Sequence, residues 1–245
     1  MNILVCLDDT DNLESRGTGE LASLLAADLD RKGWGRSRFV TRHQLLVHPD
    51  IPYTSHNSAM CFAAMVEESH LGSFIDHAAC FLERESAPGS DPGLCVATLE
   101  GLSHPERLVG FGRSAKKQVL DKKAAYTLAQ ELGVHLSEHG GSGQGVVGAL
   151  AGAGLRLGGS DGRLKGRLQF SEADGSVPVR DLLAHPLVEE VRTSDGTLPA
   201  ADDLVLLDDK VKTVLLDGKS VLLLAPDEGE AALWRTLSRR ELKNY

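Results

Sequence analysis

The sequence predicts an α+β protein of two units: an N-terminal domain whose elements begin in the order β-α-β-β-α-β, and a smaller α+β unit after it. Short apolar runs that end in polar loops alternate with segments whose apolar residues recur at helical spacing, a pattern of mixed structure. Glycines cluster between residues 152 and 166 and mark a boundary. Since the 245 residues exceed the roughly 150 of one typical domain, we expect units at 1–158 and 159–245.

The N-terminal domain begins with a buried strand and an amphipathic helix. Residues 2–7 are almost uninterruptedly apolar and lead into an aspartate cluster, as in a buried strand that ends in a polar loop. Between residues 19 and 32, leucines recur at helical spacing until Gly33 ends the pattern. We predict further strands at 38–48, 58–66 and 94–99 and a helix at 71–82. This order is compatible with the split β-α-β sandwich of ferredoxin-like domains.

The same patterns predict the remaining elements. The pattern of residues 105–133 predicts two helices, the second capped by Asp121. The pattern of residues 134–138 predicts a short strand. A glycine-rich loop then opens a helix of small residues from 146 onwards. In the second unit we expect a strand at 164–170, a hairpin of 213–216 and 220–225 around Asp217 and Gly218, and a closing helix at 230–242.

Composition and charge narrow the class of protein. Hydrophobic residues make up 42% of the chain and charged residues 25%, as in globular proteins. The net charge of −9 disfavours autonomous binding of long nucleic acid. The apolar runs fall short of the ~20 residues that span a bilayer, and no signal segment opens the chain, so we expect a cytoplasmic protein without a membrane partner. The four cysteines are too widely spaced for a zinc site or a disulfide framework, and we expect them to be reduced and buried.

Three carboxylates follow the first strand within four residues. Asp8, Asp9 and Asp11 repel one another unless they share a cation, and Mg²⁺ takes one or two protein carboxylates together with substrate phosphates. One of the aspartates could then orient or deprotonate a nucleophile. The alternative is a solvated acidic turn whose Asp and Thr side chains cap backbone N–H groups.

Two single residues are further candidates for the site. Thr18 stands where the first helix begins, so its hydroxyl either lies near a transferred phosphate or caps the helix. Asn57 belongs to a long polar connection stiffened by prolines, and we choose it as a substrate-binding residue. For a histidine of this connection, such as His56, the alternative to a ligand is an ordinary loop residue.

Two segments are candidates for holding phosphates. The glycines of the loop would let its backbone approach phosphate oxygens ahead of a helix, although no Gly-Lys-Ser or Gly-Lys-Thr follows them. Arg113 and Lys116 lie on a helical segment and would suit the oxygens of a triphosphate. The alternative for the glycine loop is a flexible connection, and the alternative for Arg113 and Lys116 is a solvated helix face. The loop glycines in question are Gly140, Gly141, Gly143 and Gly145.

In combination, these motifs resemble those of archaeal tRNA-isoleucine agmatinylcytidine synthetases. The shared segments are residues 7–11, 49–54 with 57–59, 112–116 and 140–150, in this order. The resemblance covers residues 7–150, and the remainder looks like a weaker continuation of the same two-domain catalytic core. It implies a kinase-like N-terminal domain that uses ATP and Mg²⁺. The family phosphorylates the 2-oxo group of an anticodon cytidine, and agmatine then displaces the phosphate.

The resemblance also implies roles for single residues. Asp8, Asp9 and Asp11 become metal-binding and catalytic candidates, and Thr18 a catalytic phosphoacceptor, because a threonine shortly after the family's acidic loop is autophosphorylated. The family's kinase domain is accompanied by a ferredoxin-like unit that helps to bind agmatine. Residues 159–245 are a candidate for part of that unit.

The sequence departs from the family at the site and at its end. The family enzymes continue into an OB-type domain and a zinc ribbon that grip the tRNA, whereas this sequence ends at Tyr245 without a zinc motif, so we expect no autonomous tRNA binding. Ser55 and His56 precede Asn57 where the family usually has a basic residue, and residues 12–16 also differ.

The sequence leaves two main functions open. The first is an ATP- and Mg²⁺-dependent phosphotransferase or ligase that acts on a small acceptor or an amine such as agmatine. The alternative is a non-catalytic module that binds a nucleotide or a polyamine and has kept only the scaffold. A homo-oligomer, or a partner subunit that supplies tRNA binding, remains compatible with both.

Overall fold

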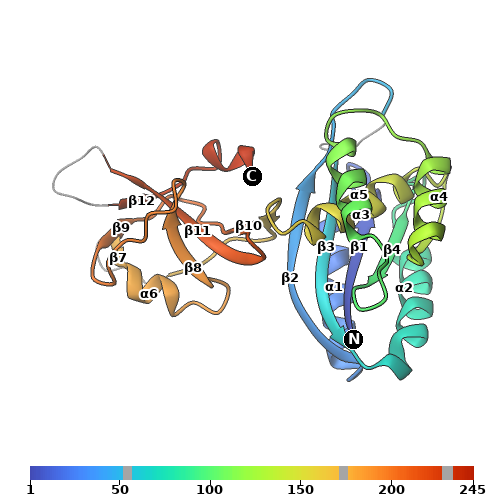
Figure 1. Ribbon diagram of the computed structural model, residues 1–245, viewed down its shortest axis with the longest axis horizontal. Helices are drawn as coiled ribbons and strands as arrows, with labels where there is room; N and C mark the ends of the chain where they lie inside the picture. Colours follow the sequence, from blue (N-terminus) through green and yellow to red (C-terminus); the bar gives the residue numbers. More distant parts are fainter. Residues whose placement is uncertain (52–56, 171–175, 228–233) are drawn as a thin grey trace. The chain divides into compact units, whose positions relative to one another are not determined.

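The computed structural model describes residues 1–51, 57–170, 176–227 and 234–245 (Figure 1). The chain divides into two compact units, Met1–Gly158 and Gly159–Tyr245. Mixed helices and strands confirm the prediction of an α+β protein. The elements of the first unit are β1 (Asn2–Asp8), α1 (Thr18–Arg31), β2 (Gly35–Gln44), β3 (Ser58–Val66), η1 (Glu68–His70), α2 (Leu71–Glu85), β4 (Gly93–Thr98), α3 (Pro105–Ala115), α4 (Lys122–Leu132), β5 (His135–Glu138) and α5 (Gly145–Leu157).

The strands of the first unit form an antiparallel sheet in the order β5-β4-β1-β3-β2. Strand β3 therefore lies between β1 and β2, which splits the first β-α-β unit. The predicted element order is confirmed. The structure also shows which strands are neighbours, which element order alone does not determine. Strand β1 is central, and its last residue, Asp8, lies opposite Gly93 of β4.

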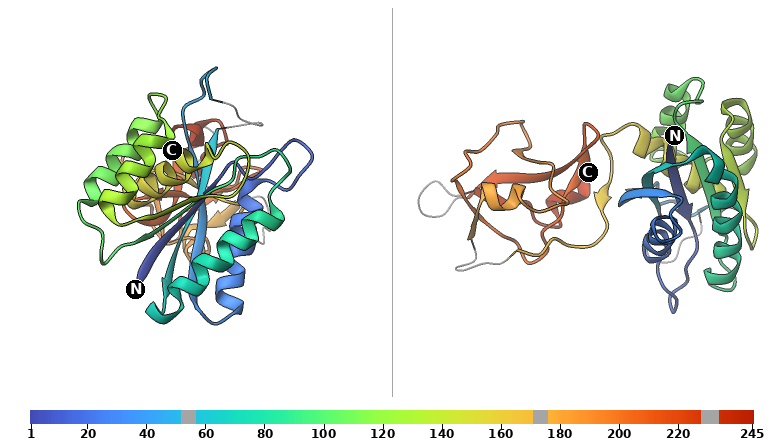
Figure 2. Two further views of the ribbon diagram at one scale, coloured as in Figure 1. Left: turned by 90° about the vertical axis from the view of Figure 1, so that its right-hand side faces the viewer. Right: turned by 90° about the horizontal axis from the view of Figure 1, so that it is seen from below.

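Helices cover both faces of this sheet, as Figure 2 shows in its left view. Because side chains alternate along a strand, β1 sends Ile3, Val5 and Leu7 to the face covered by α1 and α2, and Leu4 and Cys6 to the face covered by α3, α4 and α5. Six of the seven residues of β1 are buried. The strand that carries the acidic loop is thus held from two sides.

Helix α5 lies close against the middle of the sheet because its residues are small. Gly152 faces Cys6 and Ala59, and a Cβ at this position would come within 2.5 Å of the Cys6 Sγ. The helix contacts β1, β3 and β4. Its N-terminal end therefore comes to lie beside the C-terminal end of β1, although more than a hundred residues separate the two along the chain.

The second unit consists mainly of short strands. They follow one another in the sheet as β6-β10-β11-β12-β9-β7, and β8 pairs with β11 in parallel. The predicted hairpin is confirmed: Asp217 and Gly218, at φ 51° and 77°, form the tight turn between β10 and β11. The elements are β6 (Arg163–Leu164), β7 (Ser176–Pro178), α6 (Val179–Leu183), β8 (Glu190–Thr193), β9 (Leu204–Leu206), β10 (Val214–Leu216), β11 (Lys219–Pro226), β12 (Trp234–Thr236) and η2 (Glu241–Asn244).

Three predictions about elements and burial are wrong. The closing helix over 230–242 is replaced by strand β12, which pairs with β11, and by the short turn η2, while residues 230–233 lie outside the described residues. The strand over 164–170 is confined to β6, since Gly166 adopts φ 95°. Cys80 is exposed on α2, whereas Cys6, Cys61 and Cys95 are buried as expected, and all four are free thiols.

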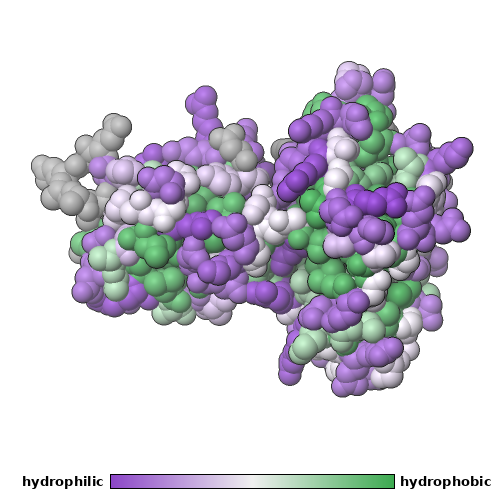
Figure 3. Space-filling model, in the orientation of Figure 1, coloured by the Kyte–Doolittle hydropathy of each residue, from purple (hydrophilic) through white to green (hydrophobic). Residues whose placement is uncertain are grey.

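The surface of each unit mixes hydrophilic and hydrophobic residues in the view of Figure 3. The large apolar residues that are more than half exposed come from separate parts of the chain and include Leu13, Met65 and Leu198. Scattered exposed apolar residues are ordinary for globular proteins. No helix within the described ranges is long and apolar enough to cross a bilayer.

Candidate functional site

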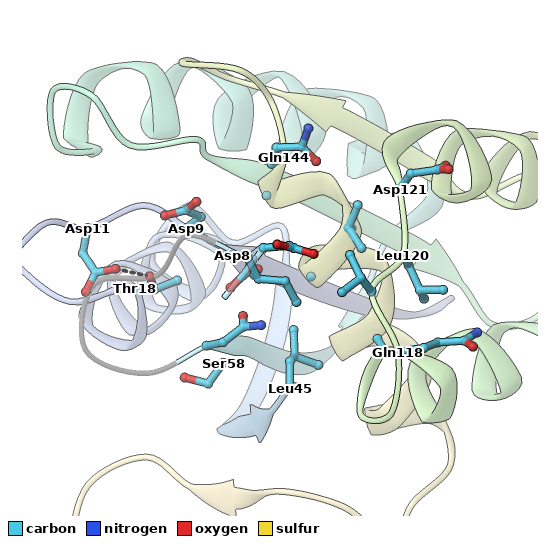
Figure 4. A pocket seen from close by; sticks show the side chains of 18 residues that line it. Asp8, Asp9, Asp11, Thr18, Leu45, Ser58, Gln118, Leu120, Asp121 and Gln144 are labelled. Carbon is cyan, nitrogen blue, oxygen red and sulfur yellow. Dashed lines mark hydrogen bonds between the residues drawn. The ribbon is translucent and has the colours of Figure 1, made fainter. Parts of the chain in front are cut away.

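The acidic loop turns sharply at the end of β1. Asp8 is 9% exposed, and Asp9 follows with φ 51°, a left-handed conformation that few residues other than glycine adopt. The loop is held at Thr10, whose carbonyl oxygen accepts a hydrogen bond of 2.9 Å from the Ala87 amide. The turn directs the carboxylates of neighbouring residues to different sides, and Figure 4 shows Asp8 and Asp9 pointing apart.

The hydroxyl of Thr18 belongs to this loop. It donates to Asp11 Oδ1 at 3.2 Å and accepts a hydrogen bond from Thr10 Oγ1 at 3.0 Å. The N-cap of α1 is Gly17, so the alternative in which Thr18 caps the helix is wrong. Thr18 is 5% exposed, and its buried hydroxyl is oriented by polar neighbours on both sides.

A cavity of about 450 Å³ opens beside the acidic loop (Figure 4). Its lining combines carboxylates, apolar side chains and amides. The carboxylates are Asp8, Asp9 and Asp11 of the acidic loop, with the Thr18 hydroxyl, and Asp50 and Asp121 of other segments; the apolar residues are Leu45, Ile51, Ala115, Val119, Leu120 and Val147; Asn57, Ser58, Gln118, Gln144, Gly145 and Gly148 complete the lining. Among the described residues, no lysine, arginine or histidine lines it.

Helix α5 contributes to the cavity through glycines that its close neighbours require. A Cβ at Gly148 would overlap the Asp8 carboxylate, and one at Gly145 would overlap the carbonyl oxygen of Asp91. A larger residue at 148 would therefore displace the Asp8 side chain, and one at 145 would displace the backbone before β4. The first turn of α5 is therefore shaped to the end of β1.

The crowding of carboxylates changes their proton affinity. Burial raises the pKa of Asp8 well above its ordinary value, and the charges of Asp9 and Asp11 raise it further. Burial, followed by the charges of Asp91 and Asp11, raises the pKa of Asp9 to about 6. A cation in the cavity would offset this repulsion, so the donor set fits a divalent metal ion.

The raised pKa of Asp9 predicts how stability depends on pH. Because the folded protein holds the proton up to about pH 6, the stabilisation from proton uptake is present below the unfolded pKa of about 3.9 and is lost as the pH rises through 6. Without metal, the free energy of unfolding should fall between pH 4 and 7 by on the order of 1–2 kcal/mol from this group, discounted for partial exposure. Urea unfolding at several pH values measures the change. Asp9→Asn should remove this part of the slope, and an unchanged slope would contradict the assignment.

The described residues contain no ready-made cluster of three or more His, Cys, Asp or Glu side chains arranged to hold a metal ion. The three aspartates of the loop are therefore not a closed coordination cage. Mg²⁺ does not need one, because it keeps waters and binds through one or two carboxylates together with substrate phosphates.

Most of the glycine-rich loop lies outside the cavity lining. Of its four candidate glycines, only Gly145 lines the cavity. The backbone amides of Ser142 and Gly143 donate to the carboxylate of Asp91, a residue that no sequence motif singled out. No local pattern could reveal this contact, because Asp91 precedes β4 and lies about fifty residues away along the chain.

The structure brings together some of the other predicted residues and not all of them. Asn57 lines the cavity, and its Nδ2 donates to the Leu46 carbonyl oxygen at 2.6 Å, which fixes the amide. Arg113 is exposed, and neither it nor Lys116 lines the cavity, although Ala115, which precedes Lys116, does. Ser55 and His56 lie outside the described residues.

Several lining residues carried no recognisable sequence signal for this site. Asp121 is predicted as a helix cap and is one, since its side chain accepts from the Ala124 amide at 2.7 Å. Its place in the cavity lining comes from the packing of α3, α4 and α5. Gln118, Leu120 and Gln144 lie between regular elements and enter the lining for the same reason.

Comparison with known proteins relates this fold to solved structures. No protein-family model and no curated protein matches the sequence. A tRNA fluorescent labeling enzyme is 27% identical at a TM-score of 0.55, over 63% of this chain and 36% of that one. TiaS, a tRNA agmatidine synthetase, in complex with an isoleucine tRNA and ATP is 26% identical at a TM-score of 0.55, over the same shares of 63% and 36%.

A third structure extends over more of the chain. TiaS with the same tRNA, AMPCPP and agmatine covers 82% of this chain and 51% of its own, at 20% identity and a TM-score of 0.53. The chain has a TiaS-like fold, as the motifs in the sequence predict, and it spans about a third to a half of the length of these solved structures.

Proposed function

We propose that the first unit binds ATP with Mg²⁺ in its cavity and transfers a phosphoryl group to, or joins an amine with, a small acceptor. The observation that carries the proposal is the meeting of the acidic loop, the Thr18 hydroxyl and the first turn of α5 around one cavity. The TiaS-like fold supports it, because TiaS has been solved with ATP and with AMPCPP and agmatine.

The acidic loop is the proposed metal site. Bound Mg²⁺ would neutralise the charge of the phosphates in this cavity. Asp8, buried and turned into the cavity, is the principal proposed ligand, and Asp9 and Asp11 are the others. The raised pKa values of Asp8 and Asp9 support this role, because both carboxylates gain a favourable partner when a cation enters.

Thr18 is the proposed phosphoacceptor within the protein. Its hydroxyl already donates to Asp11 Oδ1, so Asp11 is placed to accept the proton when the Thr18 oxygen attacks the γ-phosphorus of ATP, the bond to the β-phosphate oxygen breaks and ADP leaves. Thr10 holds the same oxygen in a fixed position. A threonine with an adjacent carboxylate is the arrangement in which a weak nucleophile is activated by a base.

The remaining lining suits a small ligand. A volume of about 450 Å³ lies within the range of small-molecule sites, and the apolar lining residues offer contact for a flat or alkyl group. Arg113 and Lys116, on the segment that carries the lining residue Ala115, are the cations proposed to reach phosphate oxygens at the edge of the cavity. Gly145 is the loop glycine proposed to lie against the nucleotide. The net charge of −9 favours a small acceptor or an amine such as agmatine over an autonomously bound tRNA.

One observation favours a second candidate function. Five aspartates line the cavity, and within the described ranges no basic side chain does. Such a lining also suits a cationic polyamine bound without chemistry. The chain would then be a binding module that has kept the scaffold.

Turnover and calorimetry on the purified protein separate the two functions. An enzyme should release ADP or AMP in the presence of Mg²⁺ once a suitable acceptor is supplied, and a phosphate on Thr18 should appear in intact-mass and peptide measurements. Thr18→Val should abolish that phosphate, while Thr18→Ser should keep it. Saturable polyamine or nucleotide binding, without product over a broad acceptor panel, would instead support the binding module.

A further inference from the structure

Residues of the glycine-rich loop donate several hydrogen bonds to one carboxylate, that of Asp91. The backbone amide of Ser142 donates to Asp91 Oδ1, its hydroxyl donates to Oδ2 at 2.9 Å, and the Gly143 amide donates to Oδ1 at 3.1 Å. Three donors from two adjacent residues thus converge on a single anionic group. Hydrogen bonds to an ionised acceptor are about twice as strong as those between neutral groups.

The backbone of the loop is shaped to this carboxylate. Gly141 and Gly143 adopt φ of 55° and 73°, and a Cβ at Gly141 would overlap Asp91 Oδ1. Successive N–H groups in such a turn form a concave nest that binds anions. The glycine at 141 is therefore required by the close approach of an oxyanion that the chain itself supplies.

Asp91 also holds the far end of the loop through its main chain. Its carbonyl oxygen accepts a hydrogen bond of 3.1 Å from the Gly145 amide. Gln144 and Gly145, which follow the nest directly, line the cavity. The side chain and backbone of Asp91 thus fix both ends of the segment that leads into the cavity wall.

We propose that Ser142 and Gly143 form an oxyanion-binding nest whose resident ligand is the carboxylate of Asp91, and that a small free oxyanion occupies the nest when this carboxylate is removed. Asp91 is accordingly a positioning residue for Ser142 and Gly143, the two residues that precede Gln144 and Gly145 of the cavity lining. Phosphate oxygens and carboxylate oxygens are the same class of ligand for backbone amides. The Asp91 carboxylate binds in preference to a free oxyanion, because it belongs to the same chain and loses no translational freedom when it binds.

Hydrogen exchange at the Ser142 and Gly143 amides, followed by NMR, tests the nest directly. In the unaltered chain both amides should be protected, and neither formate nor inorganic phosphate should change their exchange or their chemical shifts. In Asp91→Ala the exchange of the Ser142 amide should quicken by about tenfold or more, because a charged acceptor is lost. Exchange at Gly143 should quicken by less, because its amide also donates to the Gly140 carbonyl oxygen at 3.2 Å. Added formate or phosphate should restore the protection saturably.

Asp121→Ala is the matched control, because Asp121 is another carboxylate that accepts from a backbone amide, that of Ala124. It should quicken hydrogen exchange at the Ala124 amide and leave exchange at the Ser142 and Gly143 amides unchanged. If Asp91→Ala does not fold, Asp91→Asn keeps one acceptor oxygen without the charge and should show exchange between the two extremes. Exchange in Asp91→Asn as fast as that of a free loop would likewise support a nest that requires a charged ligand.

Three outcomes would overturn the proposal. The first is full protection of the Ser142 amide in a folded Asp91→Ala or Asp91→Asn variant. The second is failure of formate and phosphate to restore protection in folded Asp91→Ala. The third is saturable binding of phosphate at these amides while Asp91 is present. ATP binding to the cavity, measured on the unaltered chain by calorimetry, reports separately on the proposed function, so the two can fail independently.

Discussion

Asp8→Asn is expected to abolish Mg²⁺-dependent turnover while leaving the protein folded. Asp8 is the buried carboxylate that faces the cavity, and its removal takes away the principal proposed metal ligand. Loss of such a charge-stabilising group commonly lowers kcat by on the order of 100- to 1,000-fold. Initial rates of ADP or AMP release, measured across a range of Mg²⁺ concentrations, give the effect.

Measurements of stability distinguish this loss of turnover from unfolding of the protein. Burial and the neighbouring aspartates raise the pKa of Asp8, so the ionised carboxylate destabilises the metal-free fold. Neutral Asn should leave the midpoint of thermal unfolding equal or higher, while stabilisation by added Mg²⁺ should disappear. Asp209→Asn, at an exposed position of the second unit, is the matched control and should change neither quantity. Undiminished turnover in Asp8→Asn would refute the site.

Gly148→Ala should lower the rate of turnover by a similar factor to Asp8→Asn, because it displaces the Asp8 carboxylate without removing it. The added methyl group would overlap the Asp8 carboxylate, which must rotate away from its place in the cavity. A displacement of about 1 Å at a reacting group can cost about 100-fold in rate. The helix gains up to about 1 kcal/mol from Ala, while overpacking costs about 1–3 kcal/mol, so the net loss of stability should be small.

Gly110→Ala provides the comparison, since Gly110 lies within α3 and a Cβ there meets nothing within 4 Å. This variant should gain about 0.5–1 kcal/mol in the free energy of unfolding and keep its full rate. Denaturant unfolding and steady-state rates of both variants test the pair. Equal rates in Gly148→Ala and the unaltered chain would show that the placement of Asp8 beside α5 is not needed.

The first unit was predictable from sequence because its elements are encoded locally. Strand β3, Ser58–Val66, has the predicted bounds, and the Asp121 cap of α4 is where the pattern places it. These features depend on periodicity and on a single capping side chain, which a short window contains. The acidic loop was recognisable for the same reason, as its aspartates are consecutive or nearly so.

The predictions that are wrong or incomplete depend on contacts distant in sequence. The helical pattern near the C-terminus gave way to β12 because residues 234–236 pair with β11, and tertiary pairing overrides a weak propensity. The glycine-rich loop looked like a phosphate cradle, but its glycines at 141 and 143 accommodate Asp91 and, in part, Glu138. Nothing in the loop itself specifies either partner.

The exposure of Cys80 gives this chain a single chemical handle. Cys6, Cys61 and Cys95 are buried, and burial raises the pKa of the Cys6 and Cys95 thiols, which suppresses the reactive thiolate. Cys80 lies on α2, no residue of which lines the cavity. A maleimide dye should therefore couple at one position, and its fluorescence anisotropy would report ligand-dependent changes without an engineered cysteine.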